Sequence, residues 1–193
     1  MCAKMQITFV TLLFVFITNA TQIKNFEISK CNKNKYPVVV YNPYVQIKGS
    51  KIGISGTLTS SVNLSSPISA QLVVKRDVWG VWIPVPCVDN IGSCTYLDLC
   101  KYSIPKGTDC PQELRDNNIP CRCPIPKGNY TIPKSFENGI SLKSIVNGKY
   151  KGTALINHGK KTLACYNFSF ELYTESNERN INYNDLEPFV TLI

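Results

Sequence analysis

Histidine is almost absent from this chain of 193 residues, and His158 is the only one. It falls in a predicted turn, where a solvated role is more common than catalysis, and no nucleophile elbow or Ser-His-Asp order accompanies it. Acidic pairs such as Asp77 with Glu113 could serve a glycosidase, although nothing in the sequence promotes them. The sequence therefore favours a protein that is not an enzyme.

Long apolar segments are also lacking, since a helix needs roughly 20 such residues to cross a bilayer. The run from Ile7 to Ile17 is too short for this purpose. Lys4 precedes it and the small residues Thr18-Asn19-Ala20 follow, as in a secretory signal peptide. We therefore predict that residues 1–20 are a cleaved signal and that the mature protein is exported.

Acidic residues are few, with 13 against 21 basic ones, so the formal net charge is +8. A basic surface favours anionic partners such as acidic lipid headgroups or sialylated sugars. Lysines scattered over solvated strands would give the same total, so this alternative stays open. Nucleic acid is disfavoured, because no basic cluster with interleaved aromatic residues occurs.

Cysteine, in contrast, is abundant: the chain has nine, and Cys2 lies in the predicted signal. Eight cysteines in an exported chain predict four disulfides, although spacing alone leaves 105 possible connectivities. The pair Cys121-x-Cys123 is too closely spaced for a usual zinc site, so we expect no metal. Six cysteines fall within residues 87–123 and predict a rigid platform.

Hydrophobic residues alternate with polar ones along most of the chain, which predicts an all-β, single-domain antiparallel protein. A hairpin is predicted with its turn at Asn157-His158-Gly159, and one short helix over Asp109 to Leu114, with Asp109 as N-cap. The domain is expected to span residues 21–172. Residues 173–193 are expected to form a loosely ordered extension.

Several sequence strings carry a resemblance to a known family: LSSP from Leu64, VWGVWIPVPCVDNIGSCTYLDLC from Val78, IPKG from Ile104, CPQELRDNNIPCRCP from Cys110, KGNYTIPKS from Lys127, NGKY from Asn147 and GKKTLAC from Gly159. Together with the cysteine pattern, they closely resemble the lysosomal ganglioside activators, a family of the ML lipid-recognition superfamily. The match runs from about Cys31 to Cys165.

The resemblance implies a β-cup, or sandwich, around an apolar lipid cavity. It also implies the pairings Cys31–Cys165, Cys87–Cys94, Cys100–Cys123 and Cys110–Cys121. Members of the family lift a glycosphingolipid (ganglioside) from a membrane and present it to a lysosomal β-hexosaminidase A as non-enzymatic activators. The implied ligand is thus an acyl lipid, with no other cofactor, and contact with the membrane is peripheral.

An apolar turn matches the rim loop of that family and is formed by Val78, Trp79, Gly80, Val81 and Trp82. Trp79 stands where mammalian relatives carry a small residue. Gly80 can turn the chain, and tryptophan rings suit the headgroup layer of a membrane. Because tryptophan often fills a core instead, we expect at least one of the two rings to be exposed.

Alternation also selects residues that could line the lipid cavity: Ile54, Leu72, Val74, Tyr150, Ala154, Ile156, Phe168 and Phe170. Ordinary core packing is the alternative for each of them.

Three sequons could carry glycans, at Asn63, Asn129 and Asn167. They suit the secretory pathway, ending in the lysosome or outside the cell. A secreted lipid carrier, sensor or defence protein on the same scaffold, without a glycosidase partner, remains the alternative function.

Overall fold

The computed structural model describes residues 20–48, 51–134 and 146–175, so residues 1–19 of the predicted signal peptide and residues 176–193 lie outside the described residues. Strands dominate: β1 (Ala20–Lys30), β2 (Val38–Lys48), β3 (Lys51–Ser60), β4 (Ile68–Val78), β5 (Val81–Pro84), β6 (Thr95–Tyr96), β7 (Gly128–Ile132), β8 (Gly148–His158) and β9 (Lys161–Glu175). The predicted all-β class is confirmed.

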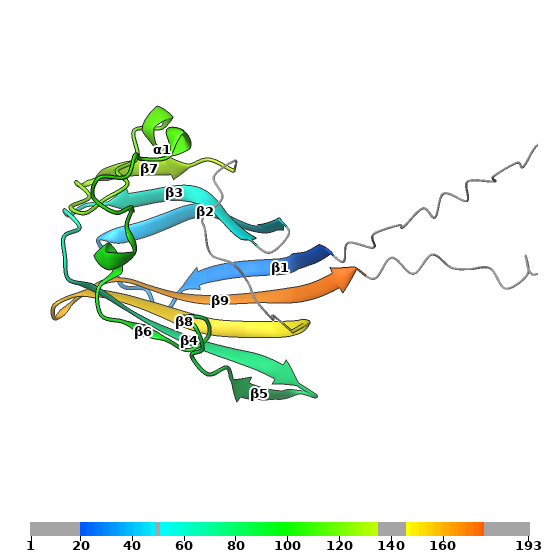
Figure 1. Ribbon diagram of the computed structural model, residues 1–193. Helices are drawn as coiled ribbons and strands as arrows, with labels where there is room; N and C mark the ends of the chain where they lie inside the picture. The colour runs from blue at the N-terminus through cyan, green and yellow to red at the C-terminus, as the bar shows by residue number, and fades with distance from the viewer. Residues whose placement is uncertain (1–19, 49–50, 135–145, 176–193) are drawn as a thin grey trace, which may run out of the picture. The chain divides into compact units, whose positions relative to one another are not determined.

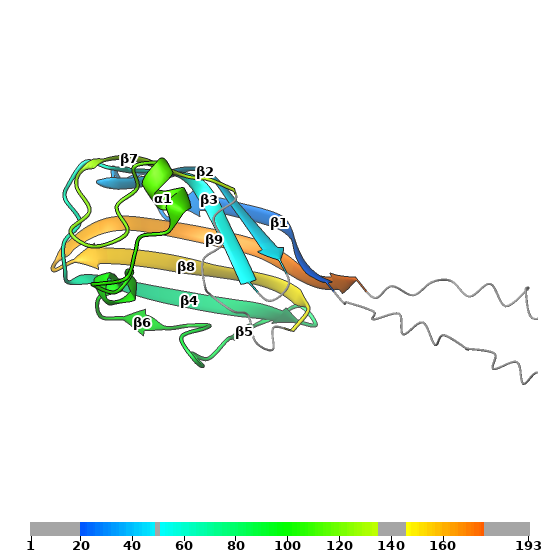
Figure 2. The ribbon, with the colours of Figure 1, turned by 45° about the horizontal axis from the view of Figure 1, so that its top comes forward.

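Two antiparallel sheets contain these strands (Figure 1). The larger has the order β1-β9-β8-β4-β5, with β6 also paired to β4, and the smaller has the order β2-β3-β7. Figures 1 and 2 both show β1 beside β2, where the two sheets come together.

Strand register assigns each side chain of the larger sheet to one of two faces. Phe168 lies opposite Gly152, which lies opposite Val74, so these residues share a face. Val74 belongs to a core cluster against which Ile47 of β2 packs, so this face points toward the smaller sheet. We call the two facing sides of the sheets the inner faces.

The hydrophobic core consists of two clusters on these inner faces. One cluster, centred on Ile68, Ala164 and Tyr166, lies where β4 begins. The other, formed by Val74, Tyr150 and Leu172, lies toward the end of β4. We call this second end of the sheets the tip end, because it carries the turn between β4 and β5.

Two short helical segments occur in the cysteine-rich region. The helix α1 (Gln112–Asp116) is the predicted one, but its N-cap is Pro111, which provides no side-chain hydrogen bond. The prediction of Asp109 as N-cap is wrong, because the helix starts three residues after it. A 3-10 turn, η1 (Leu99–Tyr102), was not predicted.

The β8–β9 hairpin differs slightly from its prediction. β8 continues to His158, which pairs with Lys161, so the turn consists of Gly159 and Lys160. Gly159 has a φ of 58°, which glycine adopts without steric cost. At its other end β9 continues to Glu175 along β1, so the sheet extends three residues into the predicted extension.

Candidate functional site

The tip of the β4–β5 hairpin is a two-residue turn of Trp79 and Gly80, with Val78 opposite Val81. Both turn residues have positive φ, 52° and 84°, and the Gly80 N–H donates to Oδ1 of Asp77 at 2.7 Å. Asn-Gly is the usual choice for a turn with two positive φ values. Here a tryptophan occupies the first position and is 99% exposed.

The second tryptophan of the predicted rim loop is placed differently. Trp82 pairs with Asp77 on the outer face of the larger sheet and is half-buried. Nζ of Lys151 lies 3.9 Å from the centre of its ring. Of the two rings, only that of Trp79 is therefore free to enter another surface, and Trp82 belongs to the sheet.

The register places all eight predicted cavity residues on the inner faces: Ile54 on β3, Leu72 and Val74 on β4, Tyr150, Ala154 and Ile156 on β8, and Phe168 and Phe170 on β9. Their surroundings differ, however. Ile156 packs against the first core cluster. Val74 and Tyr150 belong to the second cluster, and Leu72, Phe168 and Phe170 are only partly buried against it.

The two ends of the inner faces differ in how many apolar side chains they expose. In the first cluster Leu163 and Ala164 are 2% and 1% exposed. At the tip end Ile54, Ile83 and Val81 are 41%, 46% and 63% exposed, although the register directs all three inward. The apolar inner surface is thus closed at the first end, whereas at the tip end three exposed apolar side chains lie beside the buried second cluster.

Aromatic rings line the inner face of β8 and β9 between these ends. The rings of Tyr150 and Phe170 stack with centres 5.2 Å apart, and those of Phe168 and Phe170 with centres 6.1 Å apart. A Cβ atom on Gly152 would lie 2.5 Å from Cζ of Phe168, so the glycine makes room for this ring. Burial raises the pKa of the Tyr150 phenol, and the nearby charge of Arg76 lowers it by a smaller effect.

Sequence reasoning missed several inner-face residues, of which Arg76 is the most informative. It follows Leu72 and Val74 in the same alternation, so its face was predictable, but an apolar pattern does not select a cation. Ile23 was also missed, and it packs against the second cluster.

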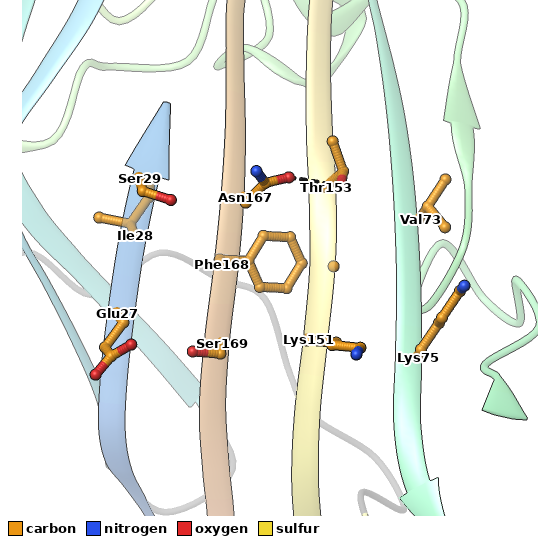
Figure 3. Close-up of a pocket in the computed structure, with 11 residues that line it drawn as sticks. Glu27, Ile28, Ser29, Val73, Lys75, Lys151, Thr153, Asn167, Phe168 and Ser169 are labelled. Atoms are coloured by element: carbon orange, nitrogen blue, oxygen red, sulfur yellow. Dashed lines mark hydrogen bonds between the residues drawn. The ribbon is translucent and has the colours of Figure 1, made fainter. Parts of the chain in front are cut away.

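A separate hollow of about 740 Å³ lies on the outer face of the larger sheet (Figure 3). Lys75, Lys151, Thr153 and Asn167 line it, and Oγ1 of Thr153 donates to Oδ1 of Asn167 at 2.9 Å. Phe168 is the only predicted cavity residue among the residues that line it. This hollow, lined mainly by residues of the outer face, is therefore distinct from the apolar inner faces.

The cysteine-rich platform contains three of the four disulfides, Cys87–Cys94, Cys100–Cys123 and Cys110–Cys121. The fourth, Cys31–Cys165, joins the end of β1 to β9. These are the pairs that the family resemblance implies.

Asp98 links this platform to the start of β4. Its carboxylate accepts hydrogen bonds from the Ser66 hydroxyl, from the N–H of Ile68 at 3.1 Å and from the N–H of Cys100 at 3.0 Å. These bonds, that of Ser66 foremost, hold the pKa of Asp98 below its ordinary value. The group therefore stays ionised in mildly acidic surroundings and keeps η1 attached to β4.

The three sequon asparagines, Asn63, Asn129 and Asn167, are all exposed in the structure. Whether they carry glycans stays a prediction. Within the described residues, no group of three or more His, Cys, Asp or Glu side chains is arranged to hold a metal ion.

No helix among the described residues has the length and apolar character needed to cross a membrane.

Comparison with known proteins connects this geometry to a family. The ML domain family model matches residues 25–172. The ganglioside GM2 activator of Macaca fascicularis is 34% identical over 78% of this chain and 85% of its own length, and that of Mus musculus is 30% identical over 79% and 84%. The solved structure of chicken MD-1 complexed with lipid IVa is similar at 16% identity and a TM-score of 0.36, over 80% of this chain and 99% of its own. The chain therefore belongs to the ML domain family and, within it, to the ganglioside activators.

Proposed function

We propose that this protein is a non-enzymatic lipid carrier that takes a glycosphingolipid out of a membrane and presents it to a soluble glycosidase. The observation that carries this proposal is the uncovered apolar surface at the tip end, where Ile54, Ile83 and Val81 face inward yet remain exposed. In a filled sandwich such residues would be buried. A hydrocarbon chain that lay against these side chains would remove their apolar surface from water.

The energy of lipid transfer explains why a carrier is needed. At about 0.8 kcal/mol per methylene, moving a chain of roughly sixteen carbons into water costs on the order of 12 kcal/mol. Apolar side chains on the two inner faces offset that cost only if the chain lies against them. The rings of Phe168 and Phe170, partly buried between the two ends, offer such a surface.

Trp79 supplies the contact with the membrane in this proposal. Its ring is fully exposed at the same end as the uncovered inner surface, so a membrane touched by the ring would face the entrance. Indole rings favour the headgroup layer of a bilayer.

The enzyme partner is a hexosaminidase in this proposal, because the relatives are named ganglioside GM2 activators. The protein works in the secretory pathway, since four disulfides suit an oxidising compartment. Within that pathway, the lysosome is the proposed site of action.

The proposal is tested by incubating the purified protein with vesicles that carry a ganglioside, with and without β-hexosaminidase A. We expect ganglioside to move from vesicles into the protein fraction, and hydrolysis to rise only when both proteins are present. Transfer without stimulation would make the protein a plain carrier or lipid sensor. Hydrolysis by this protein alone, or no transfer at all, would contradict the proposal.

A further inference from the structure

Arg76 is a cation on the apolar inner face of the larger sheet, close to the tip end. Its register partners are Tyr150 on β8 and Ile83 on β5, both of which face inward. Its neighbours in sequence, Lys75 and Asp77, face outward. The arginine is half-buried and lies two residues before the end of β4.

The guanidinium group is held in place, but only part of its hydrogen-bonding capacity is used. Its Nη2 donates to the backbone carbonyl of Asn147 at 2.8 Å, while Nε is buried with no hydrogen-bond partner among the described residues. A Cβ atom on Gly148 would lie 3.1 Å from Nε, so the group rests over this glycine. Gly148 lies opposite Leu172, a member of the second core cluster, which confirms the inner-face position.

The charge of Arg76 is therefore unusual for its surroundings. A charge beside apolar groups is costly unless an opposite charge or sufficient hydrogen bonds accompany it. The nearest carboxylate in sequence, that of Asp77, faces outward and accepts the Gly80 N–H. Within the described part of the chain, the one hydrogen bond that Arg76 donates goes to a neutral carbonyl oxygen.

We propose that Arg76 binds an oxyanion on the headgroup of the lipid whose hydrocarbon lies along the inner faces. This inference rests on the proposed function, because that function places the hydrocarbon against the second core cluster and the headgroup at the tip end. The planar guanidinium presents a fork of N–H donors that fits a carboxylate, a sulfate or a phosphate. Arg76 thus selects acidic lipids over neutral lipids with the same hydrocarbon.

The test compares Arg76→Gln with Lys75→Gln, which removes the same charge from the adjacent, outward-facing position. Each protein is incubated with neutral phosphatidylcholine vesicles that contain one member of a lipid pair. One pair is a monosialylated ganglioside and the same lipid without sialic acid. The other is sulfated galactosylceramide and its unsulfated form. Lipid that co-elutes with the protein in gel filtration is quantified.

For the wild-type protein and Lys75→Gln we expect a preference of about tenfold for the acidic member, as a charge-assisted hydrogen bond provides. For Arg76→Gln this preference should disappear, with binding of the neutral member unchanged. If Arg76→Gln loses the preference in both lipid pairs, Arg76 is a general oxyanion site. If it loses the preference in one pair only, the site is selective for the carboxylate or for the sulfate of that pair. An Arg76→Lys variant should keep part of the preference, because it keeps the charge without the fork.

Two results would overturn the assignment. One is an unchanged preference for the acidic lipid in Arg76→Gln. The other is an equal fall in the binding of both members of a pair, which would mean that Arg76 only supports the structure through its hydrogen bond to Asn147. Thermal unfolding of each variant shows whether the fold is intact, and Arg76→Lys serves if Arg76→Gln does not fold. Failure of the proposed function can be distinguished from failure of the Arg76 assignment, because the wild-type protein would then take up no lipid at all.

Discussion

At the scale of single residues, Trp79 carries two unfavourable features at once. A bulky side chain at a φ of 52° is strained, and the whole indole ring is in water. Asparagine tolerates this backbone conformation much better and is common at this position of such turns. The tip thus gives up stability to present an apolar ring, as strained residues at functional sites often do.

Replacing Trp79 by Asn should therefore stabilise the fold and weaken membrane contact. We expect the free energy of unfolding to rise by about 1 kcal/mol, because the left-handed strain is relieved. Binding to ganglioside vesicles should fall at least about tenfold through loss of the indole ring. Chemical denaturation measures the first effect, and co-sedimentation with vesicles the second.

Leu97 provides a matched control for this change. It is 78% exposed and follows β6, which pairs with the beginning of β4, far from the tip along the strand. Leu97→Asn should leave vesicle binding unchanged. If Trp79→Asn bound vesicles as well as the wild-type protein does, the role given to the tip would be wrong.

At the scale of elements, the disulfides contribute unequally to stability. Cys31 and Cys165 are 134 positions apart and join β1 to β9, whereas Cys87 and Cys94 are 7 positions apart. Chain-entropy models assign about 5 kcal/mol to the long loop and about 2 to 3 kcal/mol to the short one. The long-range bond should thus hold the sheet together, and the short one only the platform.

We expect the double variant Cys31→Ala/Cys165→Ala to lose about 2 to 3 kcal/mol more unfolding free energy than Cys87→Ala/Cys94→Ala. Denaturation by guanidinium chloride under oxidising conditions measures both losses. Equal losses, or a greater loss for the short loop, would contradict the entropic assignment.

The strand pattern of β4, β8 and β9 was predictable because a period of two assigns faces directly. Three register shifts are irregularities that this period does not reveal, and one of them lies in the β8–β9 pair after Ile156. The other two shifts interrupt β1 between Lys24 and Glu27 and β2 between Tyr41 and Tyr44. Asn25 and Asn42, both at positive φ, lie at the shifts in β1 and β2, and such asparagines are the signal available in the sequence there.

The two tryptophans of the rim loop also show what local sequence does not predict. An aromatic residue on either side of a glycine suggests one mobile apolar loop. The hairpin instead continues through Val81, so Trp82 pairs with Asp77 and contacts Lys151 across the sheet. That contact depends on strand order, which local sequence does not specify.

At the scale of the whole described domain, the two sheets form an interior that is closed at one end and apolar yet accessible at the other. The family resemblance predicted such a fold, but which inner-face residues stay exposed depends on how the sheets come together. At the tip end Val74, Tyr150 and Leu172 are buried together, with Ile47 of the facing sheet packed against them, whereas Ile54, Val81 and Ile83 stay exposed. Alternation identifies the faces but not the separation between them.

The central claim is that this interior accepts lipid hydrocarbon, and native mass spectrometry tests it most directly. The protein is incubated with vesicles that contain a ganglioside of known mass, separated from them and measured under non-denaturing conditions. The account predicts a species heavier than the free protein by the mass of the ganglioside, and retention of the lipid after dilution into lipid-free buffer. A spectrum with only the free protein, after the same exposure to vesicles, would contradict it.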